Sequence, residues 1–62
     1  MAPGPQLSSV ATALSEMTTR VTEIAESFAG SNRDDLAGTL FEVERSLAAA
    51  ARRLEDVVDR LG

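Results

Sequence analysis

The second half of the chain carries a regular hydrophobic pattern that constrains the fold more than any other feature. Apolar residues recur between positions 36 and 61 with alternating spacings of four and three, which is a heptad repeat. Such a repeat is typical of a long amphipathic α-helix, whereas a strand would alternate every second residue. The pattern predicts a helix over about residues 33–61. Its apolar positions are Leu36, Leu40, Val43, Leu47, Ala50, Leu54, Val57 and Leu61.

A second heptad pattern occupies the first half of the chain and predicts a helix over about residues 6–28. Its apolar positions are Leu7, Val10, Leu14, Met17, Val21, Ile24 and Phe28. Residues 1–5 read Met-Ala-Pro-Gly-Pro. We expect them to form a flexible N-terminal arm, because proline lacks an amide hydrogen and no bulky side chain is present to anchor the segment.

Residues 29–35 separate the two patterns and predict a turn. Gly30 suits the left-handed conformation that often follows a helix C-terminus, and Ser31 or Asn32 can cap the next helix. An alternative start for the second helix uses residues 39–42, Thr-Leu-Phe-Glu, as a capping box and leaves Gly38 outside the helix. We favour the earlier start, because Leu36 already fits the repeat.

The two patterns match each other as the arms of an antiparallel hairpin. Opposed residues in such a hairpin have position numbers with a constant sum, and seven pairs share one sum, from Phe28 with Leu36 to Leu7 with Val57. Their midpoint is Asn32, inside the predicted turn. The sequence therefore predicts an all-α chain with a single αα-hairpin domain over residues 6–62. The fifteen heptad positions of the two patterns are the predicted hairpin core.

A chain of 62 residues that folds as one hairpin is expected to be marginally stable alone. It has no cysteine and no histidine, so neither a disulfide nor a standard zinc site can stabilise it. Association with another chain remains as a source of stability. The chain should therefore have a second buried face beside the predicted core.

A second stripe runs beside the core, and its residues on the first helix are all small. The predicted partner interface on this stripe comprises Ala11, Thr18, Ala25, Ala37, Phe41, Ala48, Ala51 and Val58. We expect it to join two copies into a homodimeric four-helix bundle with a structural, adaptor or regulatory role. One alternative is that the hairpin docks on a larger protein, since apolar helix faces look alike whichever helix covers them. Another is that this stripe simply faces water.

The side chains needed for chemistry are scarce. The sequence contains no His, Cys, Lys or Tyr, so its serines and threonines have no evident activating base. Neighbouring acids such as Glu42 and Glu44 point to different helix faces and do not form an acid–base pair. We expect a protein without enzymatic activity, cofactor or metal site.

Charge argues against phosphate-rich partners, because six arginines stand against ten acids and the net charge is −4. The residues that would serve a nucleic-acid interface, which we keep as an alternative function, are Arg45, Arg52, Arg53 and Arg60. Each has an acid about one turn away, which is typical of a solvated helix face. No aromatic residue accompanies them to stack on bases.

The sequence also bears on location. Its N-terminus has neither the basic nor the apolar region of a signal peptide, and no apolar run approaches the roughly 20 residues that a membrane span needs. We expect a cytoplasmic protein without a membrane partner.

Overall fold

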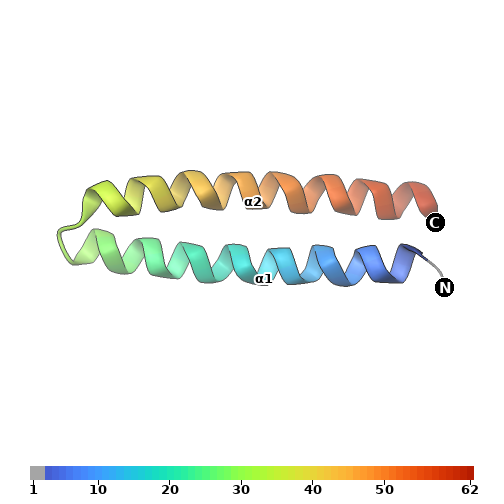
Figure 1. The fold of residues 1–62 in the computed structure, drawn as a ribbon, viewed down its shortest axis with the longest axis horizontal. Helices are drawn as coiled ribbons and strands as arrows, with labels where there is room; N and C mark the ends of the chain where they lie inside the picture. The colour runs from blue at the N-terminus through green and yellow to red at the C-terminus, as the bar shows by residue number, and fades with distance from the viewer. Residues whose placement is uncertain (1–2) are drawn as a thin grey trace.

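The protein is a helical hairpin. The computed structural model describes residues 3–62, which form helix α1 (Pro3–Gly30) and helix α2 (Asp34–Leu61), with no strand within that range. The two helices lie side by side and antiparallel, joined by a tight turn at one end of the molecule (Figure 1). The predicted all-α hairpin is confirmed.

Helix α1 begins earlier than predicted. It starts at Pro3, so residues 3–5 belong to the helix and not to a flexible arm, while residues 1 and 2 lie outside the described part of the chain. Proline is tolerated there because the first amide groups of a helix have no acceptor within the helix. The predicted start at residue 6 was too late because Pro3 and Pro5 were treated as residues that prevent a helix.

The turn differs from the prediction in which residue adopts the left-handed conformation. Gly30 remains in α1, and Asn32 has the positive φ, at 72°. The amide of Arg33 donates a hydrogen bond to the carbonyl oxygen of Phe28 at 3.0 Å, as in a Schellman motif, where asparagine is the usual substitute for glycine.

The start of α2 also differs in its capping residue. The N-cap is Arg33, which makes no side-chain capping bond, so the predicted caps Ser31 and Asn32 are wrong. Asp34 and Asp35 occupy the first turn, where their charge is favourable near the positive end of the helix dipole. Gly38 lies within the helix, which excludes the later start at residue 39.

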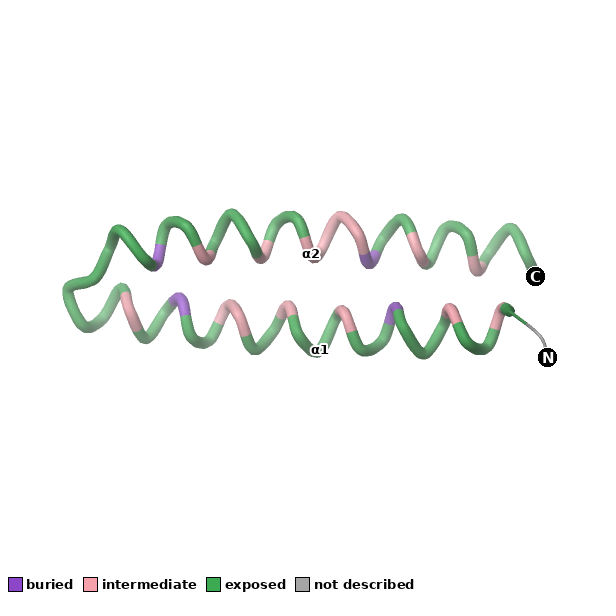
Figure 2. Tube along the Cα trace, in the orientation of Figure 1, coloured by how far each residue is buried: buried purple, intermediate pink, exposed green. Residues whose placement is uncertain are grey.

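The helices meet through stripes that alternate small and bulky residues. Only four residues in the range 3–62 are buried, and all four are alanines: Ala11, Ala25, Ala37 and Ala51. Figure 2 shows these positions on the sides of the helices that face each other. We call the whole contact the packed seam. It comprises Gly4, Leu7, Ala11, Leu14, Thr18, Val21, Ala25 and Phe28 on α1, and Ala37, Leu40, Glu44, Leu47, Ala51, Leu54 and Val58 on α2.

The packed seam corrects the sequence-based core. Leu7, Leu14, Val21, Phe28, Leu40, Leu47, Leu54 and Ala50 are half-buried, but seven other predicted core residues are exposed. Those seven are Val10, Met17, Ile24, Leu36, Val43, Val57 and Leu61. The alanine stripe occupies the helix–helix contact instead, because small side chains let two helices approach closely while the bulky residues interdigitate between them. Leu61 is exposed for a different reason, since it is the last residue of α2.

Two threonines on or beside the seam satisfy their hydroxyl hydrogen bonds within α1. The Thr18 hydroxyl donates to the carbonyl oxygen of Leu14 at 2.7 Å, and the Thr22 hydroxyl donates to that of Thr18 at 3.1 Å. Thr18 is half-buried, and its hydroxyl needs no partner on α2 because it is bonded within α1. Thr18 therefore serves as another small residue in the packed seam.

Candidate interaction surface

The bulky residues left outside the packed seam line up along the molecule. Val10, Met17 and Ile24 recur every seven residues on α1 and are each about half exposed (48%, 51% and 51%). Leu36, Val43 and Val57 are exposed on α2 at the same spacing, with the half-buried Ala50 completing the series. We call these seven residues the open apolar face.

Both halves of the open apolar face lie on one side of the hairpin. Each residue on α1 immediately precedes a small seam residue, as Val10 precedes Ala11, and each residue on α2 immediately precedes the seam residue at the equivalent heptad position, as Leu36 precedes Ala37. Two antiparallel helices are related by an approximate two-fold axis perpendicular to the plane that contains them. Equivalent heptad positions on the two helices therefore lie on the same side of that plane, and the face is continuous across both helices.

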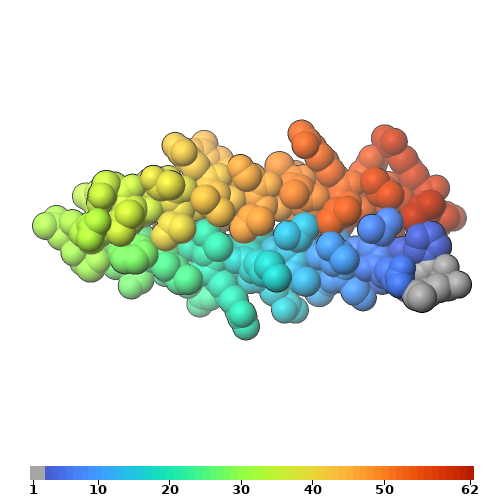
Figure 3. All heavy atoms as spheres, in the orientation of Figure 1, coloured from blue at the N-terminus to red at the C-terminus, as the bar shows by residue number. Residues whose placement is uncertain are grey.

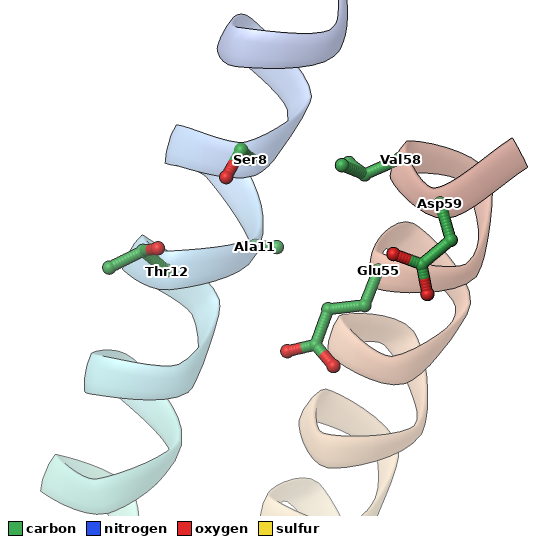
Figure 4. Close-up of a pocket in the computed structure, with 6 residues that line it drawn as sticks. All are labelled: Ser8, Ala11, Thr12, Glu55, Val58 and Asp59. Carbon is green, nitrogen blue, oxygen red and sulfur yellow. The ribbon is translucent and has the colours of Figure 1, made fainter. Parts of the chain in front are cut away.

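The opposite side of the hairpin is more polar. A shallow hollow there is lined by Ser8, Ala11 and Thr12 of α1 and by Glu55, Val58 and Asp59 of α2 (Figure 4). Ser8 and Glu55 each follow a bulky seam residue, so their meeting in one hollow supports the assignment of sides made above. The two carboxylates have no basic residue beside them in the hollow, and the hydroxyls have no activating base.

Most of the predicted partner interface is therefore already used within one chain. Ala11, Ala25, Ala37 and Ala51 are buried between α1 and α2 and are not available to a second protein, which corrects the prediction. Thr18, Ala48 and Val58 are half-buried. Phe41 is 36% exposed and follows the seam residue Leu40, which places it on the side of the hollow and away from the open apolar face.

The four arginines that form the nucleic-acid alternative are all exposed along α2. Arg60 pairs with Asp56 at 3.0 Å, one turn earlier. The other ion pair between described residues joins Arg33 to Asp35 at 3.4 Å, in the turn. The pairs expected from spacing for Arg45, Arg52 and Arg53 are not formed within residues 3–62.

Sequence reasoning missed the open apolar face because it assigned those residues to the hairpin core. A signal was present, however. Small residues recur every seventh position on α1, at Gly4, Ala11, Thr18 and Ala25, and occupy the equivalent positions Ala37 and Ala51 on α2, with Glu44 between them. Small residues at equivalent positions of both helices indicate a close helix–helix contact, and the bulky residues beside them then remain for another surface.

Comparisons of the chain with protein-family models, with curated proteins and with solved structures find no match. No helix within residues 3–62 is both long and apolar enough to cross a membrane. The described residues also contain no group of three or more acidic side chains placed to share a metal ion. The possible role of the open apolar face is therefore inferred from the geometry of the hairpin.

Proposed function

We propose that this chain is a non-enzymatic interaction protein that joins a second copy of itself through the open apolar face, forming a homodimeric four-helix bundle. One observation carries the proposal. Within residues 3–62 no bulky side chain is buried, while six bulky apolar side chains are open along one side of the hairpin. Residues such as Met17 and Ile24 stabilise a fold only when something covers them.

The arrangement of these residues supports the proposal more than their number does. Single exposed hydrophobic residues are common on protein surfaces, whereas a contiguous apolar patch usually marks an interaction site. A helix that packs in two directions needs two apolar stripes, and α1 and α2 each have a packed one and an open one. The four-helix bundle gives both stripes a partner.

The class of function that we propose is a structural, adaptor or regulatory role in the cytoplasm. Docking of the same face on a larger protein is the other interpretation of an interaction surface. Binding of nucleic acid receives less support, because Arg60 is paired with Asp56 and the net charge is −4.

Sedimentation equilibrium on the intact chain, with circular dichroism on the same samples, tests the proposal. We expect a dimer that melts cooperatively. Replacing Met17 by Glu should weaken association by at least about ten-fold, because it places a charge in an apolar contact. The matched control is Ser15→Glu, which changes an exposed residue of the same helix on the side of the hollow and should leave the mass unchanged.

Three results would contradict the proposal. A compact monomer with a cooperative melt would show that the hairpin needs no partner. A weakly helical monomer would instead favour a larger protein as the missing partner. If the chain binds a short RNA or DNA duplex at low salt and loses it as salt rises, the arginine alternative takes its place.

A further inference from the structure

The open apolar face has a symmetry that indicates how its partner lies. On α1 the three residues Val10, Met17 and Ile24 are equally spaced, so the series reads the same in both directions around Met17. On α2 the series of Leu36, Val43, Ala50 and Val57 is likewise symmetric, about a point between residues 46 and 47. A surface that superposes on itself when reversed is suited to a two-fold dimer.

The two centres of symmetry lie at nearly the same level along the molecule. The buried alanines define the levels, because Ala11 and Ala25 of α1 face Ala51 and Ala37 of α2 in two pairs (Figure 2). Residue 17 of α1 is then level with residue 45 of α2. That is about 1.5 residues, or roughly 2 Å, from the centre of the α2 series. A single two-fold axis can therefore serve both helices.

We propose that the occupant of the open apolar face is a second copy related by a two-fold axis that passes beside Met17, so that the turns of the two hairpins lie at opposite ends of the dimer. This inference rests on the homodimer proposed above and specifies its arrangement. Met17 packs against the partner's Met17, and Val10 packs against the partner's Ile24. On α2, Leu36 packs against the partner's Val57 and Val43 against the partner's Ala50.

The levels of charged residues on the outer sides of the helices agree with this arrangement. Arg53 borders the open apolar face on the outer side of α2, whereas Glu42 lies on the surface of α2 opposite the packed seam. The two-fold axis brings Arg53 of each chain within about two residues of the level of the partner's Glu42. On α1 the same operation brings Arg20 near the partner's Glu16. Within residues 3–62 of a single chain neither arginine has an ion pair, so both are available to the partner.

The other way to stack two hairpins places both turns at the same end and α1 on the partner's α2. Met17 then meets the partner's Val43, and Ile24 meets the partner's Leu36. Arg53, however, is level with the partner's Ser9 and has no acid beside it. Val57 lies beyond Val10 at the open end, opposite Pro3 and without a bulky counterpart. In the opposite-end arrangement, every bulky residue of the open apolar face has a counterpart on the partner. More charged residues also lie near the level of an opposite charge than in the same-end arrangement.

Disulfide formation distinguishes the two arrangements, because the chain contains no cysteine of its own. Met17→Cys should form a covalent dimer under mild oxidation, since only the opposite-end arrangement brings residue 17 beside its own copy. Ser15→Cys, on the other side of α1, should remain monomeric on a non-reducing gel. As a second variant, the double change Val10→Cys and Ile24→Cys should give a dimer with two disulfides. Residues 10 and 24 of one chain are roughly 21 Å apart and cannot bond to each other.

The outcomes separate this inference from the function on which it rests. If sedimentation shows a dimer but Met17→Cys does not crosslink, while the double change Ile24→Cys and Leu36→Cys does so between chains, the same-end arrangement is correct and the inference fails alone. If the protein is monomeric and no variant crosslinks, the homodimer fails together with its arrangement. Crosslinking of Met17→Cys and of the Val10 and Ile24 pair, without crosslinking of Ser15→Cys, supports both.

Discussion

At the scale of single residues, the hairpin depends on how little side chain stands between its helices. Ala25 is fully buried, and the other three buried residues are also alanines. Each presents only a methyl group, so the backbones of α1 and α2 can approach while leucines pack on either side. The size of these residues is therefore more important to the hairpin than their hydrophobicity.

Enlarging one of them should be costly. We expect Ala25→Leu to lower the free energy of unfolding by about 1–3 kcal/mol, because the added carbons must push the helices apart or adopt strained rotamers. The same substitution at the exposed Ala29, one turn further along α1, is the control and should change stability by less than about 0.5 kcal/mol. Thermal and urea unfolding followed by circular dichroism would measure the difference. Equal stability of the two variants would contradict the packed seam.

The turn offers a second test at the residue scale. Asn32 has a φ of 72°, a conformation that costs L-residues roughly 1–2 kcal/mol and is worst for β-branched side chains. We expect Asn32→Val to destabilise the hairpin by about that amount, whereas Asn32→Gly should be at least as stable as the parent. The midpoint of urea unfolding for the three proteins is the measurement. A less stable glycine variant would mean that the asparagine side chain itself holds the turn.

At the scale of elements, the heptad patterns predicted the existence, the length within a few residues and the antiparallel pairing of both helices. They did not identify which stripe closes the hairpin. On α1, bulky residues such as Leu14 lie between a stripe that contains Met17 and a stripe that contains Ala11, and Leu47 is placed in the same way on α2. Either stripe, taken together with these bulky residues, gives spacings of three and four. Periodicity alone cannot separate the two choices. The sizes of the neighbouring residues decide, because the contact that brings the helices closest takes the small ones.

The same ambiguity explains how much of the interaction surface could be predicted. That each helix carries two apolar stripes was evident from the sequence, and the expectation of a partner, which stays a prediction, came from the same observation. The stripes were assigned in reverse, so Ala51 was expected in the partner interface and Val43 in the hairpin core. The start of α1 at Pro3 and the capping residue of α2, Arg33, were missed for a local reason, since both depend on the geometry of helix ends and not on the repeat.

Gly38 lowers the helix propensity of α2, and its cost to stability can be tested. It lies exposed inside α2, and a Cβ added there would meet no atom within 4 Å. Gly38→Ala should therefore stabilise the protein by about 0.5–1 kcal/mol through helix propensity. Gly62→Ala, just after the end of α2, is the control and should have a smaller effect. No gain in the unfolding midpoint for Gly38→Ala would indicate that another chain approaches α2 closely at this position.

At the scale of the whole molecule, the single hairpin is a thin rod. It measures 47 × 14 × 11 Å and has a radius of gyration of 14.3 Å, whereas a compact domain of this length would have about 11 Å. Figure 3 shows the side chains of α1 and α2 in contact along the rod. A rod two helices wide has no interior that a bulky side chain can enter. Stacking a second hairpin on the open apolar face creates that interior without lengthening the molecule.

The opposite-end dimer makes a further prediction about charge. Arg53 and Glu42 of one chain are separated by three turns of α2, roughly 16 Å, so they cannot form an ion pair within that chain. In the proposed dimer Arg53 of each chain lies near the partner's Glu42, so the ion pair occurs twice. Reversing one charge, by Arg53→Glu or Glu42→Arg, should weaken dimerisation by about 0.5–2 kcal/mol through two like-charge contacts. The combined variant restores opposite charges and should recover most of the loss.

Sedimentation equilibrium on the parent, the two single variants and the combined variant at low salt gives this coupling as a double-mutant cycle. The coupling should shrink as salt is raised, since exposed charges are screened. Arg45→Glu, on the outer surface of α2 away from the open apolar face, serves as the charge-matched control and should leave dimerisation nearly unchanged. Effects of Arg53→Glu and Glu42→Arg that simply add would show that the two residues do not meet across the dimer. In that case the ion pair is absent, and the crosslinking of Met17→Cys alone decides whether the turns lie at opposite ends.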